Sequence, residues 1–329
     1  MQSQEHAFAR WSVAQRVAGG ADATSVDRAF DEGHILRTHV LRPTWHYVSR
    51  TDLRWLMALS GPRILARTAR RRGDLGLDDR TLSKANDLIA DKVAGEPQTR
   101  RDLADALEHN RVSVDGQRLA YIVMHAELTG VICSGPMRGK QHTYAAFDER
   151  VAPGRAINDD EAIAKLTRRY FSTRGPATLR DFVWWSGLST ADARRGIDMA
   201  ATHLSSRSID GRTCWFREMT APRVGHRVDL VQCYDEAIIS YSESRDVLQT
   251  AQVDFAVPGY RDGYTHVVLL DGRLAGHWRP VLRKSGWTVE TRIRQPLDRV
   301  DQRALDTAIK RYSTFRENST TDAEQEDSQ

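Results

Sequence analysis

A recurring order of elements constrains most strongly what this chain can fold into. Three times between residues 24 and 216, apolar residues at helical spacing are followed by two short β-rich runs that flank a turn. Helices followed by a two-stranded hairpin are the order of the winged helix, a variant of the helix-turn-helix. The order therefore predicts a mostly α-helical protein with small β-hairpins, in the α+β class, rather than a single barrel or sandwich.

Local signals place the elements of each repeat. Gly33 and Gly130 end helices, whereas the side chains of Thr99, Thr178 and Ser189 can cap the first turns of others. The repeats share this order but no strong residue identity. The expected helices are 26–32, 51–72, 79–94, 100–108, 117–128, 159–172, 179–185 and 190–201, and the expected strands are 34–41, 44–48, 131–134, 142–147, 206–207 and 213–216.

The pattern changes after residue 228. A buried-looking run is followed by β-rich segments that predict a three-stranded meander and then by one amphipathic helix. The last 13 residues hold five acids, no base and almost no apolar side chain, a composition typical of disorder. The regions expected are three winged-helix units at 1–50, 51–150 and 151–220, a small C-terminal α+β unit at 228–316, and a disordered acidic tail at 317–329.

The charge of the chain permits nucleic-acid binding without proving it. The formal net charge is +4, and the acidic tail hides a more basic remainder. Arginine far outnumbers lysine among the 48 basic residues. The planar guanidinium suits phosphates and base edges, but a GC-rich genome would produce the same bias.

Other features exclude some classes of protein. No apolar run is long enough to span a bilayer, and residues 1–10 lack the apolar core of a signal peptide. The three cysteines form no CxxC pair and have no metal-site spacing. We therefore expect a soluble, cytoplasmic, nucleoid-associated protein, monomeric and without cofactor or metal.

Two hairpins carry candidate DNA contacts. The tip of the second hairpin, 135–141, holds Arg138 and Lys140 between glycines, and His142 follows it. A basic, mobile tip is what a wing that contacts phosphates or the minor groove requires, although an ordinary solvated turn has the same composition. His142 could equally contact DNA or serve the structure.

The first hairpin is the other candidate. It carries His34, His39 and His46 together with Arg37 and Arg42. This basic strip could hold phosphates or a damaged base, or it could pack the hairpin against its helices. Without a nearby carboxylate or thiolate in the strip, we do not expect a metal site.

Several stretches resemble the winged helix DNA-binding domain-containing proteins that include the AlkZ- and YcaQ-like DNA glycosylases. Examples are the sequences EGHILRTHVLRPTWH and WWSGL. The matching stretches are 32–46, 52–56, 124–128, 133–136, 139–142, 175–179, 184–188 and 234–236, so the resemblance covers nearly the whole chain.

The resemblance implies a catalytic pair, Gln-x-Gln in the AlkZ-like branch, and here it falls on Gln2-Ser3-Gln4. Ser3 stands where a hydrophobic residue is usual. Relatives carry one or two helices before this motif, so the first unit is expected to be truncated, or its start misassigned, with Gln2 on a fraying terminus. Two carboxamides suit a cationic alkylated purine, which leaves readily, because only a water and an oxocarbenium-like sugar need stabilising.

Asp235 and Glu236 are second-line catalytic candidates. They stand beside apolar residues, where a carboxylate either binds an arginine or caps a helix, or else lines a lesion cleft. The favoured function is cleavage of the N-glycosidic bond of N-alkylpurines or interstrand crosslinks in double-stranded DNA by a monofunctional glycosylase, a hydrolase. The alternatives are a non-catalytic DNA-binding protein, such as a transcriptional regulator, and a degenerate relative that binds DNA weakly.

Overall fold

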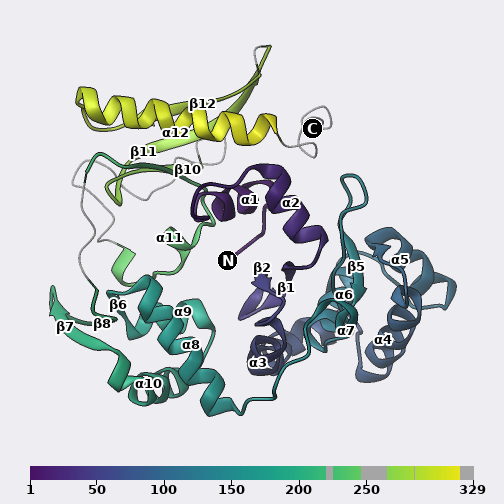
Figure 1. Cartoon of the computed structure of the whole chain (residues 1–329). Coiled ribbons are helices and arrows are strands. Elements are labelled where there is room, and N and C mark those ends of the chain that lie inside the picture. The colour runs from purple at the N-terminus through teal and green to yellow at the C-terminus, as the bar shows by residue number, and fades with distance from the viewer. Residues whose placement is uncertain (220–224, 246–264, 285, 319–329) are drawn as a thin grey trace. The chain divides into compact units, whose positions relative to one another are not determined.

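The computed structural model describes residues 1–219, 225–245, 265–284 and 286–318. They form two compact units, each assembled from separate stretches of the chain (Figure 1). Unit 1 comprises Met1–Gln4, Arg28–Thr167 and Ser186–Met199, and unit 2 comprises Glu5–Asp27, Arg168–Trp185 and Ala200–Gln329. The expected divisions at residues 50, 150 and 220 remain a prediction, and all of the expected acidic tail after Asn318 lies outside the described residues.

Unit 1 contains the first hairpin and the helices that follow it. The hairpin pairs β1 (Ile35–Val40) with β2 (Arg42–Ser49), and Leu41 makes the turn with a φ of 64°. The long helix α3 (Leu53–Asp74) approaches the C-terminal end of α6 (Arg118–Leu128) so closely that a Cβ on Gly61 would lie 2.8 Å from the Leu128 carbonyl oxygen. Glycine at position 61 therefore permits the contact between these two helices.

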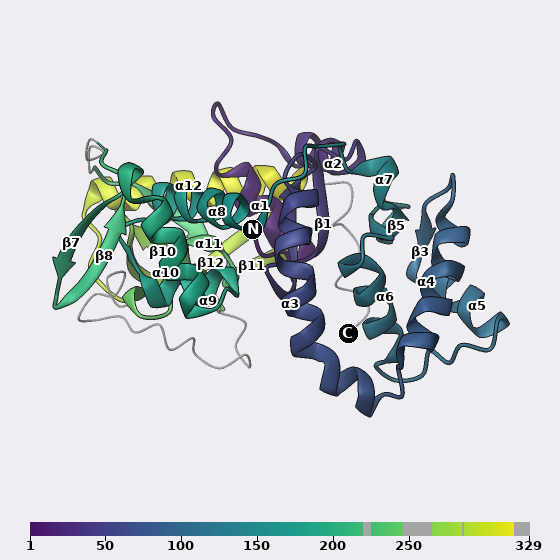
Figure 2. The same ribbon diagram turned by 90° about the horizontal axis from the view of Figure 1, so that it is seen from below.

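One hydrophobic core of unit 1 lies between a group of helices and its three-stranded sheet (Figure 2). It is built from α4 (Asp79–Val93), α5 (Arg100–His109) and α6 (Arg118–Leu128), with the strands β3 (Gln98–Thr99), β4 (Ile132–Ser134) and β5 (Thr143–Ala146). Leu82, Ile89 and Leu103 are among its fully buried side chains. A short helix, α7 (Phe147–Arg150), follows the sheet, and α10 (Thr190–Met199) also belongs to unit 1.

Unit 2 has its core between one helix and one sheet. The antiparallel sheet has the order β12-β11-β10-β9, with β9 (Val228–Val231), β10 (His266–Leu270), β11 (Arg273–Arg283) and β12 (Gly286–Ile293). The helix α12 (Arg299–Glu317) lies along it in Figure 1. Trp278 and Tyr312 are fully buried at this interface, where their rings meet edge to face with centroids 4.8 Å apart.

The sheet of unit 2 has one strand more than the three-stranded meander that the sequence predicts. The run 230–241 contributes β9 to the sheet and the short helix α11 (Glu236–Ile239), so the sheet has four strands. The sequence pattern predicts no element at 6–22, whereas α1 (His6–Ala14) forms there and α2 (Ala23–Asp31) follows. Trp11 anchors α1 in the core of unit 2 and donates from Nε1 to the Leu230 carbonyl at 2.7 Å.

The third repeat has the expected order of elements. It runs through α8 (Asp159–Arg174), β6 (Ala177–Thr178), α9 (Leu179–Ser186) and α10, then a 3-10 turn at Ala201–His203 and the hairpin β7 (Ser205–Ile209) and β8 (Arg212–Phe216). Its sheet order, β6-β8-β7, matches the order β3-β5-β4 of the preceding repeat. In both sheets a two-residue strand before the helices pairs with the second strand of the hairpin.

A small shared sequence signature lies at the point where β3 and β6 enter their helices. Both sites read Thr-x-Arg-Asp, with Thr99 and Asp102 in one and Thr178 and Asp181 in the other. In each, the threonine backbone N–H donates to the aspartate and the aspartate backbone N–H donates to the threonine hydroxyl oxygen. The reciprocal cap fixes the angle between strand and helix in both repeats.

Among the described residues, no helix is long and apolar enough to cross a membrane.

The core of unit 2 predicts a specific acid sensitivity. His266 is 3% exposed, its ring lies 4.2 Å from that of Phe8 and 4.7 Å from that of Trp278, and its Nδ1 accepts from the Cys233 N–H. Burial lowers the pKa of His266 to about 3. The unfolded chain takes up this proton near pH 6.5 and the folded chain does not, so the free energy of unfolding falls as the pH drops from about 6.5 toward 3.

Replacing His266 with Asn keeps the acceptor and removes the titration. The variant should be less stable at pH 7 but should lose less stability between pH 6.5 and 4.5, measured by urea denaturation at each pH. An unchanged slope would show that other groups carry the acid sensitivity.

Candidate functional site

The first four residues lie along the hairpin of unit 1. Tyr47 donates its N–H to the Met1 carbonyl at 2.6 Å, the Ser3 N–H donates to the Trp45 carbonyl at 2.7 Å, and Gln2 faces His46 in an antiparallel bridge. The segment thus runs antiparallel beside β2, held by an isolated β-bridge and the backbone hydrogen bonds on either side of it. Gln2 is 9% exposed, so the expectation of a fraying terminus was wrong, because backbone pairing with β2 holds the residue.

The two glutamines of the motif are held differently. The Gln2 amide oxygen accepts from Arg42 Nη2 at 3.3 Å in a buried position. Gln4 is exposed, and its amide oxygen accepts from the Trp45 backbone N–H at 3.0 Å. This bond engages the amide oxygen of Gln4, and the NH2 group is the donor of the same amide. Ser3 between them is fully buried.

Arg37 braces the same segment from the neighbouring strand. Its Nε donates to the Ser3 carbonyl at 3.1 Å, and its guanidinium carbon lies 4.2 Å from the centre of the Trp45 ring. Burial lowers the pKa of Arg37, with nearby Tyr47, Glu127 and Tyr144 opposing the shift. The guanidinium is thus charged, partly desolvated and stacked on an indole, an arrangement that holds Trp45 in place.

A buried carboxylate that the sequence reading did not select completes this network. Glu127 is 1% exposed on α6, and one of its oxygens hydrogen-bonds Nδ1 of His39. The other oxygen, Oε1, has no hydrogen-bond partner among the described residues. The His39 ring in turn lies 4.8 Å from that of Trp45. The signal available in the sequence was an acid among the apolar residues of 122–128, a position where a lone carboxylate requires a partner.

The remaining histidines of the strip have separate surroundings. His34 is exposed and 3.4 Å from Glu32, whereas His46 is buried with its Nδ1 2.8 Å from the Thr44 carbonyl. Within the described part of the chain, the one group of residues spaced to hold a metal is His226, Asp298 and Asp301 in unit 2, two of them exposed. The hairpin histidines are not part of it.

The tip of the second hairpin is less strongly charged than its sequence indicates. Arg138 donates to the Pro97 carbonyl at 2.6 Å and lies 3.3 Å from a carboxylate oxygen of Asp102 and 3.7 Å from one of Glu96. Lys140 is exposed. Acidic neighbours therefore balance part of the charge of Arg138.

His142 is uncharged at neutral pH. Burial, together with the positive charge of Arg37, lowers the pKa of its imidazole to about 4. The ring is half-buried and lies 6.2 Å from that of Phe30. Any contact that His142 makes with DNA at pH 7 would use its ring or a neutral hydrogen bond, not a charge.

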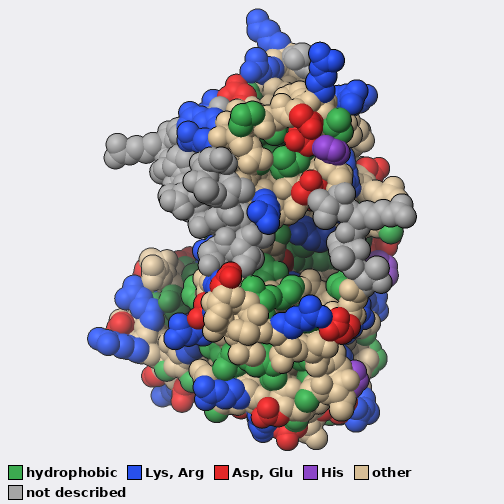
Figure 3. Space-filling view, turned by 90° about the vertical axis from the view of Figure 1, so that its left-hand side faces the viewer, with side chains coloured by type: hydrophobic (Ala, Val, Ile, Leu, Met, Phe, Trp, Pro, Cys, Tyr) green, Lys and Arg blue, Asp and Glu red, His purple; other side chains and the backbone are tan. Residues whose placement is uncertain are grey.

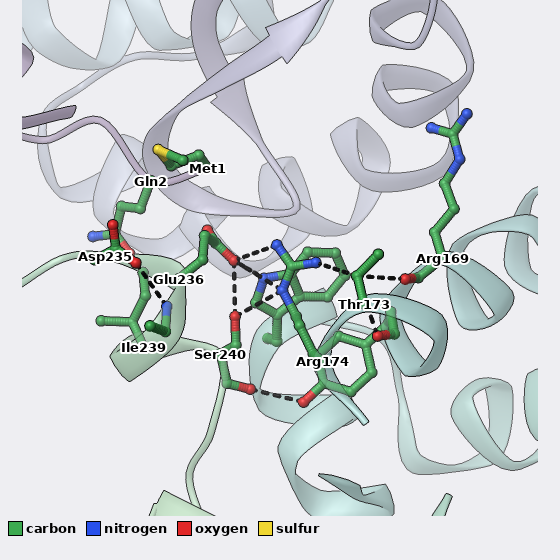
Figure 4. A network of polar contacts seen from close by, with 12 residues as sticks. Met1, Gln2, Arg169, Thr173, Arg174, Asp235, Glu236, Ile239 and Ser240 are labelled. Carbon is green, nitrogen blue, oxygen red and sulfur yellow. Dashed lines mark hydrogen bonds and ion pairs between the residues drawn. The ribbon is translucent and has the colours of Figure 1, made fainter. Parts of the chain in front are cut away.

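In unit 2, Asp235 and Glu236 are both buried and both engaged. Asp235 caps α11 through the Ala237 N–H, accepts from Ser12 Oγ at 2.5 Å and forms an ion pair with Arg16. Glu236 accepts from Arg174 Nη2 at 2.9 Å, Ser240 Oγ at 2.8 Å and Trp185 Nε1 at 2.6 Å (Figure 4). These are the arginine-binding and helix-capping roles that the sequence reading weighed against a catalytic one.

Charged side chains of both signs are mixed on the face of the molecule that Figure 3 shows, with no single large basic patch among the described residues there. Local arrangements of arginine, not the overall charge, therefore distinguish one part of this face from another.

Comparison with known proteins shows the family of this chain. The family model of DNA glycosylase AlkZ-like proteins matches residues 1–315. The chain belongs to the AlkZ-like family. A curated relative, an interstrand DNA cross-link repair glycosylase of Streptomyces sahachiroi, is 25% identical over 302 residues, which cover 85% of this chain and 80% of the relative.

The solved structure of Streptomyces sahachiroi DNA glycosylase AlkZ has the same fold, with a TM-score of 0.73 at 20% sequence identity, over 97% of this chain and 88% of that one. The resemblance read from the sequence is confirmed. The coarse fold class, helices with several small antiparallel sheets, is confirmed as well.

The buried Glu127–His39 contact gives a prediction for stability. Glu127→Ala should lower the free energy of unfolding by about 1–3 kcal/mol, because it leaves the buried His39 without its partner. Glu108→Ala, which removes an exposed carboxylate from α5 of the same unit, is the control and should change stability by less than about 0.5 kcal/mol. Urea denaturation at pH 7 measures both, and equal stabilities would show that the contact contributes nothing.

Proposed function

We propose that this protein is a monofunctional DNA glycosylase that releases N-alkylated purines, or unhooks interstrand crosslinks, from double-stranded DNA. The observation that carries the proposal is the fixed Gln2–Gln4 segment. It matches the Gln-x-Gln signature of the resemblance, and it is paired with β2, with Gln2 and Ser3 buried and Gln4 exposed. Family membership supports the reaction class, and the curated relative is a crosslink repair glycosylase.

The tandem winged-helix interpretation forms part of this proposal. Two repeats share the order of helices and strands, the three-stranded sheet in which the first strand pairs with the third, and the Thr-x-x-Asp cap. The hairpin strands β4–β5 and β7–β8 are then the wings, and the residues that contact DNA include Arg37, Arg42, Arg138 and Lys140. Phosphate contacts by such residues set the register of the duplex on the protein.

The proposed chemistry needs only side chains of this chain and water. An alkyl group on N7 makes the purine cationic, so the bond from the purine to C1′ of the sugar breaks with its electron pair returning to the base. Water adds to C1′ of the resulting oxocarbenium-like sugar, loses a proton to solvent and leaves an abasic site. The Gln4 NH2 group would hold that water by its oxygen, while Trp45 and Arg37 fix the orientation of the amide.

His39 and His46 are assigned positioning roles in the same proposal. His39 links Glu127 to the Trp45 ring, and His46 pairs with Gln2 across β2. Asp235 and Glu236 stay second-line catalytic candidates, because each already accepts from an arginine and is held in a helix or loop contact.

The Gln4 side chain tests the catalytic assignment. Gln4→Ala should lower single-turnover release of N7-methylguanine from methylated duplex by about 10²-fold, the effect of losing one oriented transition-state donor. Gln4→Glu should also fail, because it keeps the acceptor for the Trp45 N–H but removes the NH2 donors. Gln117→Ala, at another exposed glutamine of unit 1, should release base normally.

Duplex affinity and thermal stability of both Gln4 variants should barely change, because the side chain is exposed. Unimpaired release by both variants would overturn the assignment and move attention to Asp235 and Glu236. Footprinting that reveals one preferred operator, with no base release by the native chain, would favour a regulator instead.

The tip of the second hairpin gives a separate electrostatic prediction. Replacing both Arg138 and Lys140 with Ala should lower the slope of log K against log salt by about one to two, because the phosphate contacts of the tip are lost. Fluorescence anisotropy with random duplex measures the slope. Equal slopes for the native protein and the double variant would place the tip in solvent.

A further inference from the structure

A cleft of about 550 Å³ opens in unit 1 next to the hairpin that holds the Gln-x-Gln segment. Its lining has a basic part and an apolar part. The basic part consists of Arg37, Arg100 and Arg101, and the apolar part of Trp45, Ala104, Leu119 and Tyr144 with the neutral ring of His142. A volume of this size is typical of sites for small molecules or single building blocks of a polymer.

Arg100 and Arg101 bring positive charge that the protein does not balance by pairing. Within the described part of the chain, neither forms an ion pair with a carboxylate, whereas the charge of Glu127 acts on Arg37. Arg100 and Arg101 occupy the first two positions of α5, where the helix dipole adds to the positive potential. The acid in that first turn, Asp102, accepts from Thr99 in the cap and from Arg138. An anion is therefore the complement of this wall.

The apolar part of the lining suits a flat, uncharged ring. Tyr144, which belongs to it, is 7% exposed. With a pKa of about 4, His142 presents a neutral imidazole at pH 7. Aliphatic side chains of Ala104 and Leu119 complete the surface. An aromatic heterocycle would bury apolar area here without bringing a second charge near the guanidinium groups.

We propose that this cleft binds one unpaired nucleotide of the DNA, with its phosphate on the three guanidinium groups and its base against the apolar wall. The proposal rests on the proposed function only in taking DNA as the ligand. A paired base lies inside the helical stack and cannot enter such a cleft, so the site selects DNA in which a nucleotide has left the stack. Because Trp45 also anchors Gln4, the occupant would lie beside the catalytic segment.

Two fluorescent duplexes of equal length test the cleft, one fully paired and one with a single-nucleotide bulge. The native protein should bind the bulged duplex roughly tenfold more tightly at the same salt concentration, the size expected from one stacked base. Ala104→Trp, which fills the cleft, should remove this preference and leave affinity for the paired duplex within about twofold. Arg101→Ala should lower the salt slope by about one for the bulged duplex alone.

Arg80→Ala is the matched control, because it removes an exposed arginine from α4, outside the lining of the cleft. It should leave the ratio of the two affinities unchanged. Circular dichroism and thermal unfolding show whether Ala104→Trp is folded, and Arg101→Ala tests the site independently if it is not. The proposal is overturned if the native protein shows no bulge preference, or if the preference survives both cleft variants.

An assay of base release by the native protein distinguishes failure of the cleft proposal from failure of the proposed glycosylase function. Release of N7-methylguanine without any bulge preference would remove the cleft proposal and leave the glycosylase standing. A bulge preference without base release would remove the glycosylase proposal and leave the cleft proposal standing.

Discussion

The pairing of Met1–Gln4 with β2 is the constraint on which the candidate site depends. Two glutamines on a free chain end could not hold a water, because the entropy of ordering them would oppose every contact. Here the backbone hydrogen bonds of Tyr47 and Ser3 hold the segment beside β2, and Arg37 adds a contact to the Ser3 carbonyl. The catalytic hypothesis depends on this pairing, because it positions the motif on the hairpin.

The hairpin that receives this segment is itself held from within unit 1. The Trp45 ring contacts the guanidinium of Arg37 and the imidazole of His39. Glu127, on α6, hydrogen-bonds this imidazole. A buried carboxylate with one unsatisfied oxygen is costly, so this arrangement persists only because the surrounding core fixes it. The contacts of Glu127 with His39, of His39 with Trp45, and of Trp45 with Gln4 therefore link α6 to the N-terminal segment.

Unit 2 also contains buried carboxylates, but these connect segments of the chain and do not support a hairpin. Asp235, Glu236 and Asp181 are buried or nearly so, and each is surrounded by donors. Asp181 accepts the backbone N–H groups of residues 242–244. Burial by itself raises the pKa of Asp181, but the Ser244 hydroxyl and backbone N–H donors outweigh it and lower the pKa. The carboxylates of this unit therefore connect segments distant in sequence, which explains why acids next to apolar residues resembled catalytic candidates in the sequence alone.

The sequence by itself determined the order of helices and hairpins, the family, and the Gln-x-Gln motif, because these follow from local periodicity, capping residues and short matching stretches. It could not give the position of Gln2, the partner of His39, the neutral state of His142 or the ion pairs of Arg138. Each of these depends on residues brought together from distant parts of the chain, as Glu127 meets His39 across 88 positions. The sequence also shows no sign of α1 or of the strand β9, because their apolar residues show no clear period. These two elements are stabilised by the core in which Trp11 and Leu230 are buried. Periodicity sets local structure, whereas burial and the charges that burial forces together are properties of the tertiary fold.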